Sequence, residues 1–172
     1  MSNGWSPQPS SVRPKRRLTY TWSSRISMTI RVHNRQRTVA IDTVAVKKRV
    51  LQIMAYLGCS DQELSVVFGS DRLLQALNRT YRHKDRPTNV LAFPQSPTYA
   101  GEPATTMLGD VIVSLPTAAR EAHDLQQSLE ARVVYLLLHG ILHLLGHDHE
   151  GSTAQRRRME ALEREVLAYL QA

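Results

Sequence analysis

The feature that most restricts the fold of this chain is an apolar run that ends in regularly spaced histidines. Residues 139–149 read H-G-I-L-H-L-L-G-H-D-H. His139 and His143 stand four residues apart in a helical pattern, which places both imidazoles on one helix face with Cβ atoms about 5–6 Å apart. Gly146 follows where a helix commonly ends, because glycine adopts the left-handed conformation without strain. The chain is then able to fold back and present His149 beside the other two.

This spacing indicates a metal site. Three histidine ligands and one open position are typical of catalytic zinc, whereas structural zinc is usually held by four protein ligands. Cys59 is the only cysteine, so a closed cysteine site is excluded. Burying several imidazoles without partners costs free energy, and a shared metal removes that cost. We therefore predict one Zn²⁺ per chain, bound by His139, His143 and His149.

The same segment argues against a zinc protease. Proteases of the H-E-x-x-H type carry a glutamate general base directly after the first histidine, and here that position is Gly140. A zinc site is still compatible with hydrolysis of a phosphodiester or another ester. His147 and Asp148 are candidate general bases by proximity, but His147 also fits a turn and Asp148 also fits a role in orienting a ligand histidine.

Length and composition favour one folded domain without a membrane span. A chain of 172 residues is long enough to bury a sizeable core. The longest apolar run, residues 133–138, has six residues, whereas a membrane helix needs about 20. A single cysteine fits a reducing compartment. We expect a cytoplasmic protein with no membrane partner and no small-molecule organic cofactor.

The positive charge is concentrated at the N-terminus. Residues 1–27 hold five Lys or Arg and no acidic residue, and the remaining chain has 17 basic and 15 acidic residues. We predict a disordered basic extension over residues 1–27 and a folded domain over residues 28–172. An organelle transit peptide and a translation start at Met28 are alternative explanations of this segment; its prolines and missing amphipathic pattern weaken the first.

Hydrophobic periodicity predicts interleaved strands and helices. Strands are expected at residues 29–33, 64–68, 89–93 and 110–115, and helices at 42–57, 71–81, 128–145 and 153–170. Ser70-Asp71 and Ser128 are expected caps, and residues 94–109 a loop. The helix at 71–81 should bury Leu73, Leu74, Leu77 and Tyr81. The fold class is α+β with α/β-like layering: a single domain with a small mixed β-sheet packed with helices, and the zinc site on a central helix.

A second candidate segment lies in residues 77–94. Arg72, Arg79 and Arg82 fall within an arc of about 80° opposite the leucines of the predicted helix. On composition alone this is a solvated charged face. Its position at a turn that leads into a strand favours binding, because arginine makes bidentate contacts with phosphate. Asp110, in a later L-G-D stretch, either reaches the cleft or caps a strand. The structural role is favoured, since the sequence offers it no pairing partner.

Three segments together resemble the YbeY family of bacterial endoribonucleases. The family pattern L-N-x-x-Y-R-x-K-D-x-P-T-[DN]-V-L-[SA]-F-P matches residues 77–94, L-G-D-[IV]-x-[IV]-S matches 108–114, and H-G-x-L-H-L-x-G-[YH]-D-H matches 139–149. The resemblance covers residues 28–172. It departs from the commoner family residues at His147 and Ala92, and neither is a predicted ligand.

The resemblance implies a zinc held by His139, His143 and His149 and a catalytic role for Arg82. It also implies a metal-dependent endoribonuclease that is selective for single-stranded RNA. The resemblance further implies a role in maturation of the 16S rRNA 3′ end and in ribosome quality control, with rRNA and the small ribosomal subunit as partners. Two rivals remain. One is a ribosome-assembly binding factor with a structural zinc, which the missing glutamate favours, and the other is a metal-dependent hydrolase of another ester.

Overall fold

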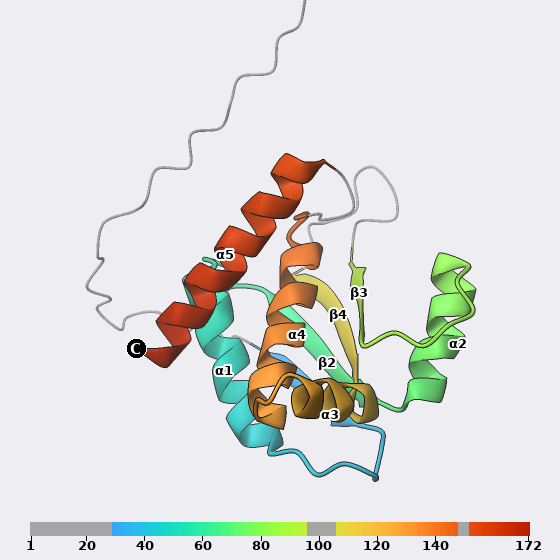
Figure 1. Cartoon of the computed structure of the whole chain (residues 1–172). Coiled ribbons are helices and arrows are strands. Elements are labelled where there is room, and N and C mark those ends of the chain that lie inside the picture. Colours follow the sequence, from blue (N-terminus) through green and yellow to red (C-terminus); the bar gives the residue numbers. More distant parts are fainter. Residues whose placement is uncertain (1–28, 96–105, 148–151) are drawn as a thin grey trace, which may run out of the picture.

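The computed structural model describes residues 29–95, 106–147 and 152–172. The extension predicted for residues 1–27, Asp148 and the predicted ligand His149 lie outside the described residues. The elements run in the order β1 (Ile30–Asn34), α1 (Thr43–Tyr56), β2 (Glu63–Gly69), α2 (Asp71–Arg82), β3 (Val90–Pro94), β4 (Met107–Ser114), α3 (Leu115–Asp124), α4 (Leu129–Leu144) and α5 (Thr153–Gln171), as Figure 1 shows.

The strands form one mixed four-stranded sheet, which confirms the predicted α+β class. Its order is β1-β2-β4-β3. β1, β2 and β4 are mutually parallel, whereas β3 pairs antiparallel with β4. Among the described strands, β3 therefore lies at an edge of the sheet and pairs on one side only.

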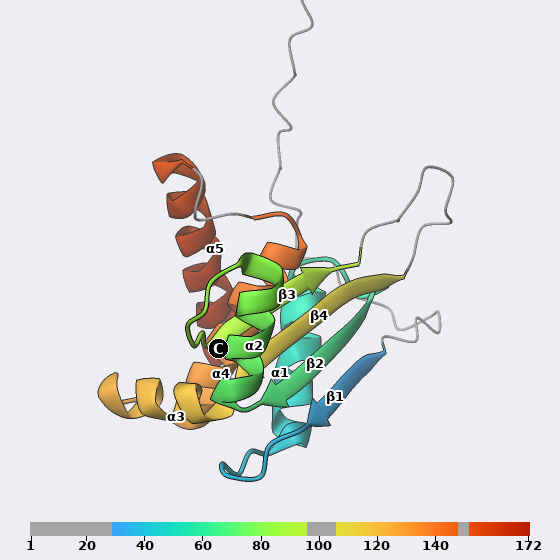
Figure 2. The same cartoon turned by 90° about the vertical axis from the view of Figure 1, so that its right-hand side faces the viewer.

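The helices cover the two faces of the sheet unequally. α1 and α4 pack on one face with α5 outside them, and α2 lies on the opposite face (Figures 1 and 2). Nine of the sixteen residues of α4 are buried, so the predicted metal-site helix is the central one. Among the described residues, no helix is long and apolar enough to cross a membrane.

Local sequence signals explain most helix ends. The Ser70 and Ser128 side chains accept hydrogen bonds from the first turns of α2 and α4, as predicted. Gly146, with φ +85°, ends α4 in a Schellman turn: its N–H bonds to the His143 carbonyl at 3.0 Å, and the His147 N–H bonds to the Leu142 carbonyl at 3.0 Å. The backbone of His147 thus takes part in the turn, as the sequence suggested.

Three structural expectations were wrong. The strand β4 begins at Met107, within the loop that was expected over residues 94–109. The helix α3 was not predicted from the sequence, because Leu115 was assigned to the end of the preceding strand. Ser114 in fact caps α3, and Pro116 sits in its first turn, where a missing N–H costs nothing. Tyr81 was expected in the core but is 63% exposed, and Asn78 takes a buried place on α2 instead. Side chains three or four residues apart share a helix face, so the leucine pattern alone did not separate these two positions.

α4 lies unusually close to the sheet at Gly140. A Cβ added at this position would come within 2.6 Å of Val111 Cγ1 on β4. Val111 is fully buried and its β-branched side chain has little rotamer freedom. A glutamate at position 140, as in the H-E-x-x-H proteases, would therefore be directed into β4 and would not face a metal. The close approach explains why the protease general base is missing.

We expect Gly140→Ala to lower the free energy of unfolding by about 1–2 kcal/mol, because overpacking outweighs the gain of about 1 kcal/mol in helix propensity. In a Val111→Ala background the same change should become neutral or stabilising, since the methyl group then has room. Urea unfolding of the four proteins of this double-mutant cycle measures the effect. A stabilising Gly140→Ala change in both backgrounds would show that α4 is not held this closely.

Candidate active site

A cleft of about 720 Å³ brings the two candidate segments of the sequence together. Its lining residues come from α4, from α2 and the loop that follows it, and from the whole of β3. The lining residues are Asn78, Tyr81, Arg82, Lys84, Arg86, Pro87, Thr88, Asn89, Val90, Leu91, Ala92, Phe93, Pro94, His139, Gly140 and His143. The cleft therefore wraps around the free edge of β3.

His139 and His143 point the same ring nitrogen toward a common point. Their Nε2 atoms are 3.2 Å apart. Two imidazole nitrogens bound to one tetrahedral zinc at about 2.0–2.1 Å each would lie about 3.3 Å apart. The pair thus fits two corners of a zinc site. Among the described residues no third His, Cys, Asp or Glu completes a three-ligand group, and the predicted third ligand, His149, lies outside them.

Glu163 on α5 sets the tautomer of His139. The Nδ1 atom of His139 donates to Glu163 Oε1 at 2.7 Å. A carboxylate is only an acceptor, so the imidazole proton resides on Nδ1 and the Nε2 lone pair faces His143. A carboxylate behind a histidine in this way is a common support for a metal ligand. Glu163 is only 6% exposed, so its carboxylate needs hydrogen-bond partners within the protein.

Tyr135, one turn before His139 on α4, is the second partner of Glu163. Its hydroxyl donates to Glu163 Oε2 at 3.4 Å. Burial raises the pKa of the Tyr135 hydroxyl, and the neighbouring Glu163 carboxylate raises it further. The hydroxyl consequently stays protonated and remains a donor at neutral pH. Both oxygens of the buried carboxylate are thereby satisfied.

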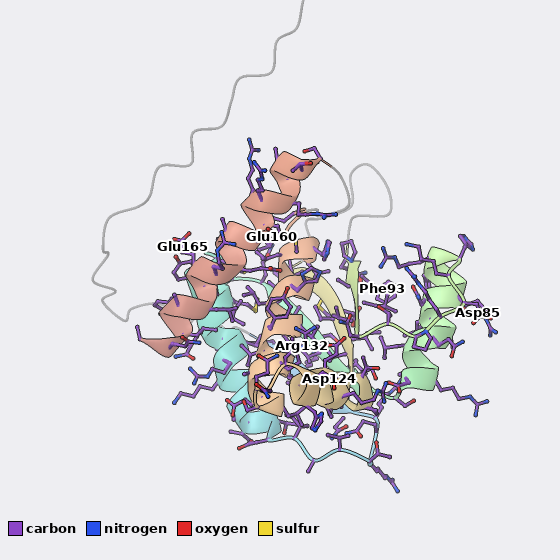
Figure 3. All side chains as sticks on the ribbon, viewed as in Figure 1. Asp85, Phe93, Asp124, Arg132, Glu160 and Glu165 are labelled. Carbon is purple, nitrogen blue, oxygen red and sulfur yellow. The ribbon has the colours of Figure 1, made fainter. Side chains whose placement is uncertain are left out.

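Polar contacts continue from Tyr135 to the start of β3. The Arg132 guanidinium, labelled on α4 in Figure 3, lies 4.8 Å from the centre of the Tyr135 ring. Its Nε donates to Glu121 Oε2 on α3 at 2.8 Å, and Glu121 Oε1 accepts from Asn89 Nδ2 at 2.9 Å. Asn89 lines the cleft immediately before β3. The chain of contacts ties the helix of the histidines to the strand across from it.

The loop after α2 is held in shape from within. His83 ends α2 in the left-handed conformation, with φ 55°. The N–H groups of His83 and Lys84 both point at the Asn78 carbonyl, and the buried Asn78 side chain donates to the Arg86 carbonyl at 2.8 Å. These bonds fix the backbone that carries Arg82, Lys84 and Arg86. The three cations are exposed on the wall of the cleft.

The other end of α2 is anchored by Asp71. Its carboxylate accepts from the hydroxyl of Ser114, from Thr117 Oγ1 at 2.7 Å and from Arg120 Nη2 at 2.7 Å. Burial alone would raise the pKa of the Asp71 carboxyl, but these hydrogen bonds and the guanidinium outweigh it and leave the pKa below its ordinary value. Asp71 is thus charged at neutral pH and ties α2 to the start of α3.

The structure brings together three of the four predicted site residues. Arg82, His139 and His143 all line the cleft, although Arg82 is 57 residues before His139 in the chain. Asp110 does not line it. Asp110 pairs with Phe93 across β3 and β4, next to Val111, so its side chain is on the sheet face opposite α4. This position agrees with a structural role.

Sequence reasoning missed Glu163, although a signal for it was present. Met159 and Val166 are buried on α5, and Glu163 lies between them at helical spacing. A carboxylate inside an apolar helix stripe needs a polar partner in the core. The pattern therefore predicts a buried hydrogen bond, but only the fold shows that the partner is His139.

Comparison with known proteins supports the resemblance seen in the motifs. The family described as endoribonuclease YbeY matches residues 31–171. A relative from Geobacter metallireducens named endoribonuclease YbeY is 48% identical over 145 residues, which are 84% of this chain and 97% of the relative. Its namesake from Geobacter sulfurreducens is 45% identical with the same coverage. Another from Aquifex aeolicus is 44% identical over 68% of this chain and 76% of the relative.

A solved structure has the same fold. The solution structure of TM1509 from Thermotoga maritima superposes with a TM-score of 0.54 at 23% sequence identity. The match covers 83% of this chain and 92% of that protein. At this identity the comparison supports the fold alone.

Proposed function

We propose that this chain, which belongs to the endoribonuclease YbeY family, is a zinc-dependent endoribonuclease that cleaves single-stranded RNA. The observation that carries the proposal is the shared cleft, in which the converging Nε2 atoms of His139 and His143 and the guanidinium of Arg82 line one cavity. The names of the relatives support RNA as the substrate. Zinc is supported by the ligand type, by the 3.2 Å spacing and by the Glu163 carboxylate behind His139.

The residues of the cleft have separable tasks in this proposal. Zinc held by His139, His143 and the predicted ligand His149 would supply Lewis acidity for hydrolysis of the phosphodiester. Glu163 keeps the proton of His139 on Nδ1 and the ring in place. Arg82 lies on the wall of the cleft, where a guanidinium binds phosphate oxygens and stabilises negative charge that develops in the transition state.

We further propose a role in maturation of the 16S rRNA 3′ end and in ribosome quality control, in the cytoplasm and with the small ribosomal subunit as partner. This finer assignment is supported by the resemblance of residues 77–94, 108–114 and 139–149 to the family motifs. Among described residues that line the cleft there is no Asp or Glu and there are three Lys or Arg, which suits a polyanionic substrate.

The metal site is tested by zinc content and zinc affinity. We expect about one equivalent of zinc in the parent by elemental analysis, and much less in His139→Ala, His143→Ala and His149→Ala. Glu163→Gln should keep the fold but weaken zinc affinity about 10- to 100-fold in a chelator competition, because a histidine loses its charged support. His147→Ala is the matched control and should keep its zinc. Full zinc occupancy in His139→Ala would contradict the site.

The role of Arg82 is tested by cleavage of a single-stranded RNA. Arg82→Ala should keep zinc and fold but lose about 10²- to 10³-fold in cleavage rate, because it removes a donor to charge in the transition state. Arg82→Lys should restore only part of the rate, since an ammonium does not reproduce the guanidinium fork.

Arg79→Ala is the matched control for charge. Arg79 lies one turn earlier on α2, is exposed, is 4.0 Å from Asp85, and does not line the cleft. It should therefore cleave at nearly the parental rate. If Arg79→Ala and Arg82→Ala lose cleavage rate equally, the effect of Arg82 is one of general electrostatics and not of its place in the cleft. Equal cleavage by the parent and by His143→Ala would indicate a contaminating nuclease and favour the assembly-factor rival.

A further inference from the structure

An aromatic ring stands exposed on the wall of the basic cleft. Tyr81 is 63% exposed at the end of α2. The large apolar side chains exposed in the described part of the chain are Val44, Tyr81, Leu125 and Tyr169, and of these only Tyr81 lines the cleft. Exposing a ring of this size to water forgoes the free energy of burying it. A ligand that covers the ring would recover that free energy.

Phe93 holds the Tyr81 ring at the edge of the sheet. The two ring centroids are 5.1 Å apart, with the planes inclined by 69°, which is the favourable edge-to-face arrangement. Phe93 projects from β3 toward α2, on the sheet face opposite His139 and His143 (Figure 3). Tyr81 and Phe93 together form an aromatic platform. The platform and the histidines thus lie on opposite sides of the β3 edge and line the same cleft.

The surroundings of the platform suit one class of ligand. Arg82, Lys84 and Arg86 line the same cleft, and among the described residues the cleft is lined by no carboxylate. A basic groove that carries exposed aromatic rings is the usual arrangement for single-stranded nucleic acid, in which phosphates contact the cations and bases stack on the rings. In a duplex both faces of each base are already stacked, so only an unpaired base is able to use the ring.

We infer that Tyr81, braced by Phe93, is a platform on which an unpaired RNA base stacks, at a nucleotide beside the phosphodiester that faces His139 and His143. The inference rests on the proposed function for the identity of the substrate. The strand would cross the free edge of β3, with its backbone along the cations. Tyr81 then contributes selectivity for single strands, whereas the histidines contribute hydrolysis.

The test is binding of a fluorescent single-stranded RNA by the full chain, followed by anisotropy with EDTA present to stop metal-dependent cleavage. Tyr81→Leu should weaken binding about 5- to 100-fold, because leucine is apolar but has no aromatic face. Tyr81→Phe should bind like the parent. Tyr169→Leu is the matched control: Tyr169 is also exposed and also paired with an aromatic ring, Tyr56 at 4.9 Å, but it lies outside the cleft.

A set of RNAs that each lack one base locates the stacked nucleotide without altering the protein. Loss of the base at one position should weaken RNA binding by the parent. The same loss should not weaken binding by Tyr81→Leu any further. A matched duplex should bind the parent and Tyr81→Leu equally. Thermal unfolding of each variant checks that the substitution at this exposed position leaves the fold intact.

The outcomes separate this inference from the proposed nuclease. If the parent cleaves RNA but Tyr81→Leu binds the single strand as tightly as the parent, the platform is overturned and the nuclease stands. If binding depends on Tyr81 and on one base while the metal-loaded parent cleaves no RNA, the platform stands and the nuclease falls.

Discussion

The packing of α4 against β4 at Gly140 is the constraint on which the site depends. Absence of a side chain there lets the helix approach Val111 so closely that even a methyl group would not fit without a shift. His139 immediately precedes this contact and His143 follows it by one turn, so the same close packing sets how near the two imidazoles stand to β3. One glycine therefore excludes the protease base and positions the proposed metal ligands.

A buried charge imposes a second constraint, between α4 and α5. Glu163 is nearly inaccessible to water, and its carboxylate is satisfied by His139 and Tyr135 on α4. Removing either partner would leave a buried carboxylate short of hydrogen bonds, which costs more than the net contribution of one such bond. α5 is thus more than a cover for the core. It holds one histidine in the tautomer and orientation that the site requires.

The sequence predicted features whose cause is local, and it missed those whose cause is a partner far along the chain. Helices with periodic apolar faces and polar caps were predicted to within a few residues, as at Ser70 and Ser128. α3 was missed because a strand passes directly into its cap at Ser114. The role of Glu163 depends on His139, 24 residues away, which no local pattern specifies.

Asn78 is buried on α2 where Tyr81 was expected, and the physical reason for this difference bears on the cleft. Asn78 is needed inside because its side-chain amide donates to the Arg86 carbonyl in the loop. Its backbone carbonyl also accepts from the N–H groups of His83 and Lys84, as the carbonyl of any residue at this position could. A leucine or tyrosine there would pack but would leave the Arg86 carbonyl without this donor. The buried amide holds the loop that carries the cations, and Tyr81 lies exposed against Phe93 at the β3 edge. With Asn78 and not Tyr81 in the buried place on α2, an aromatic face stays open beside the loop.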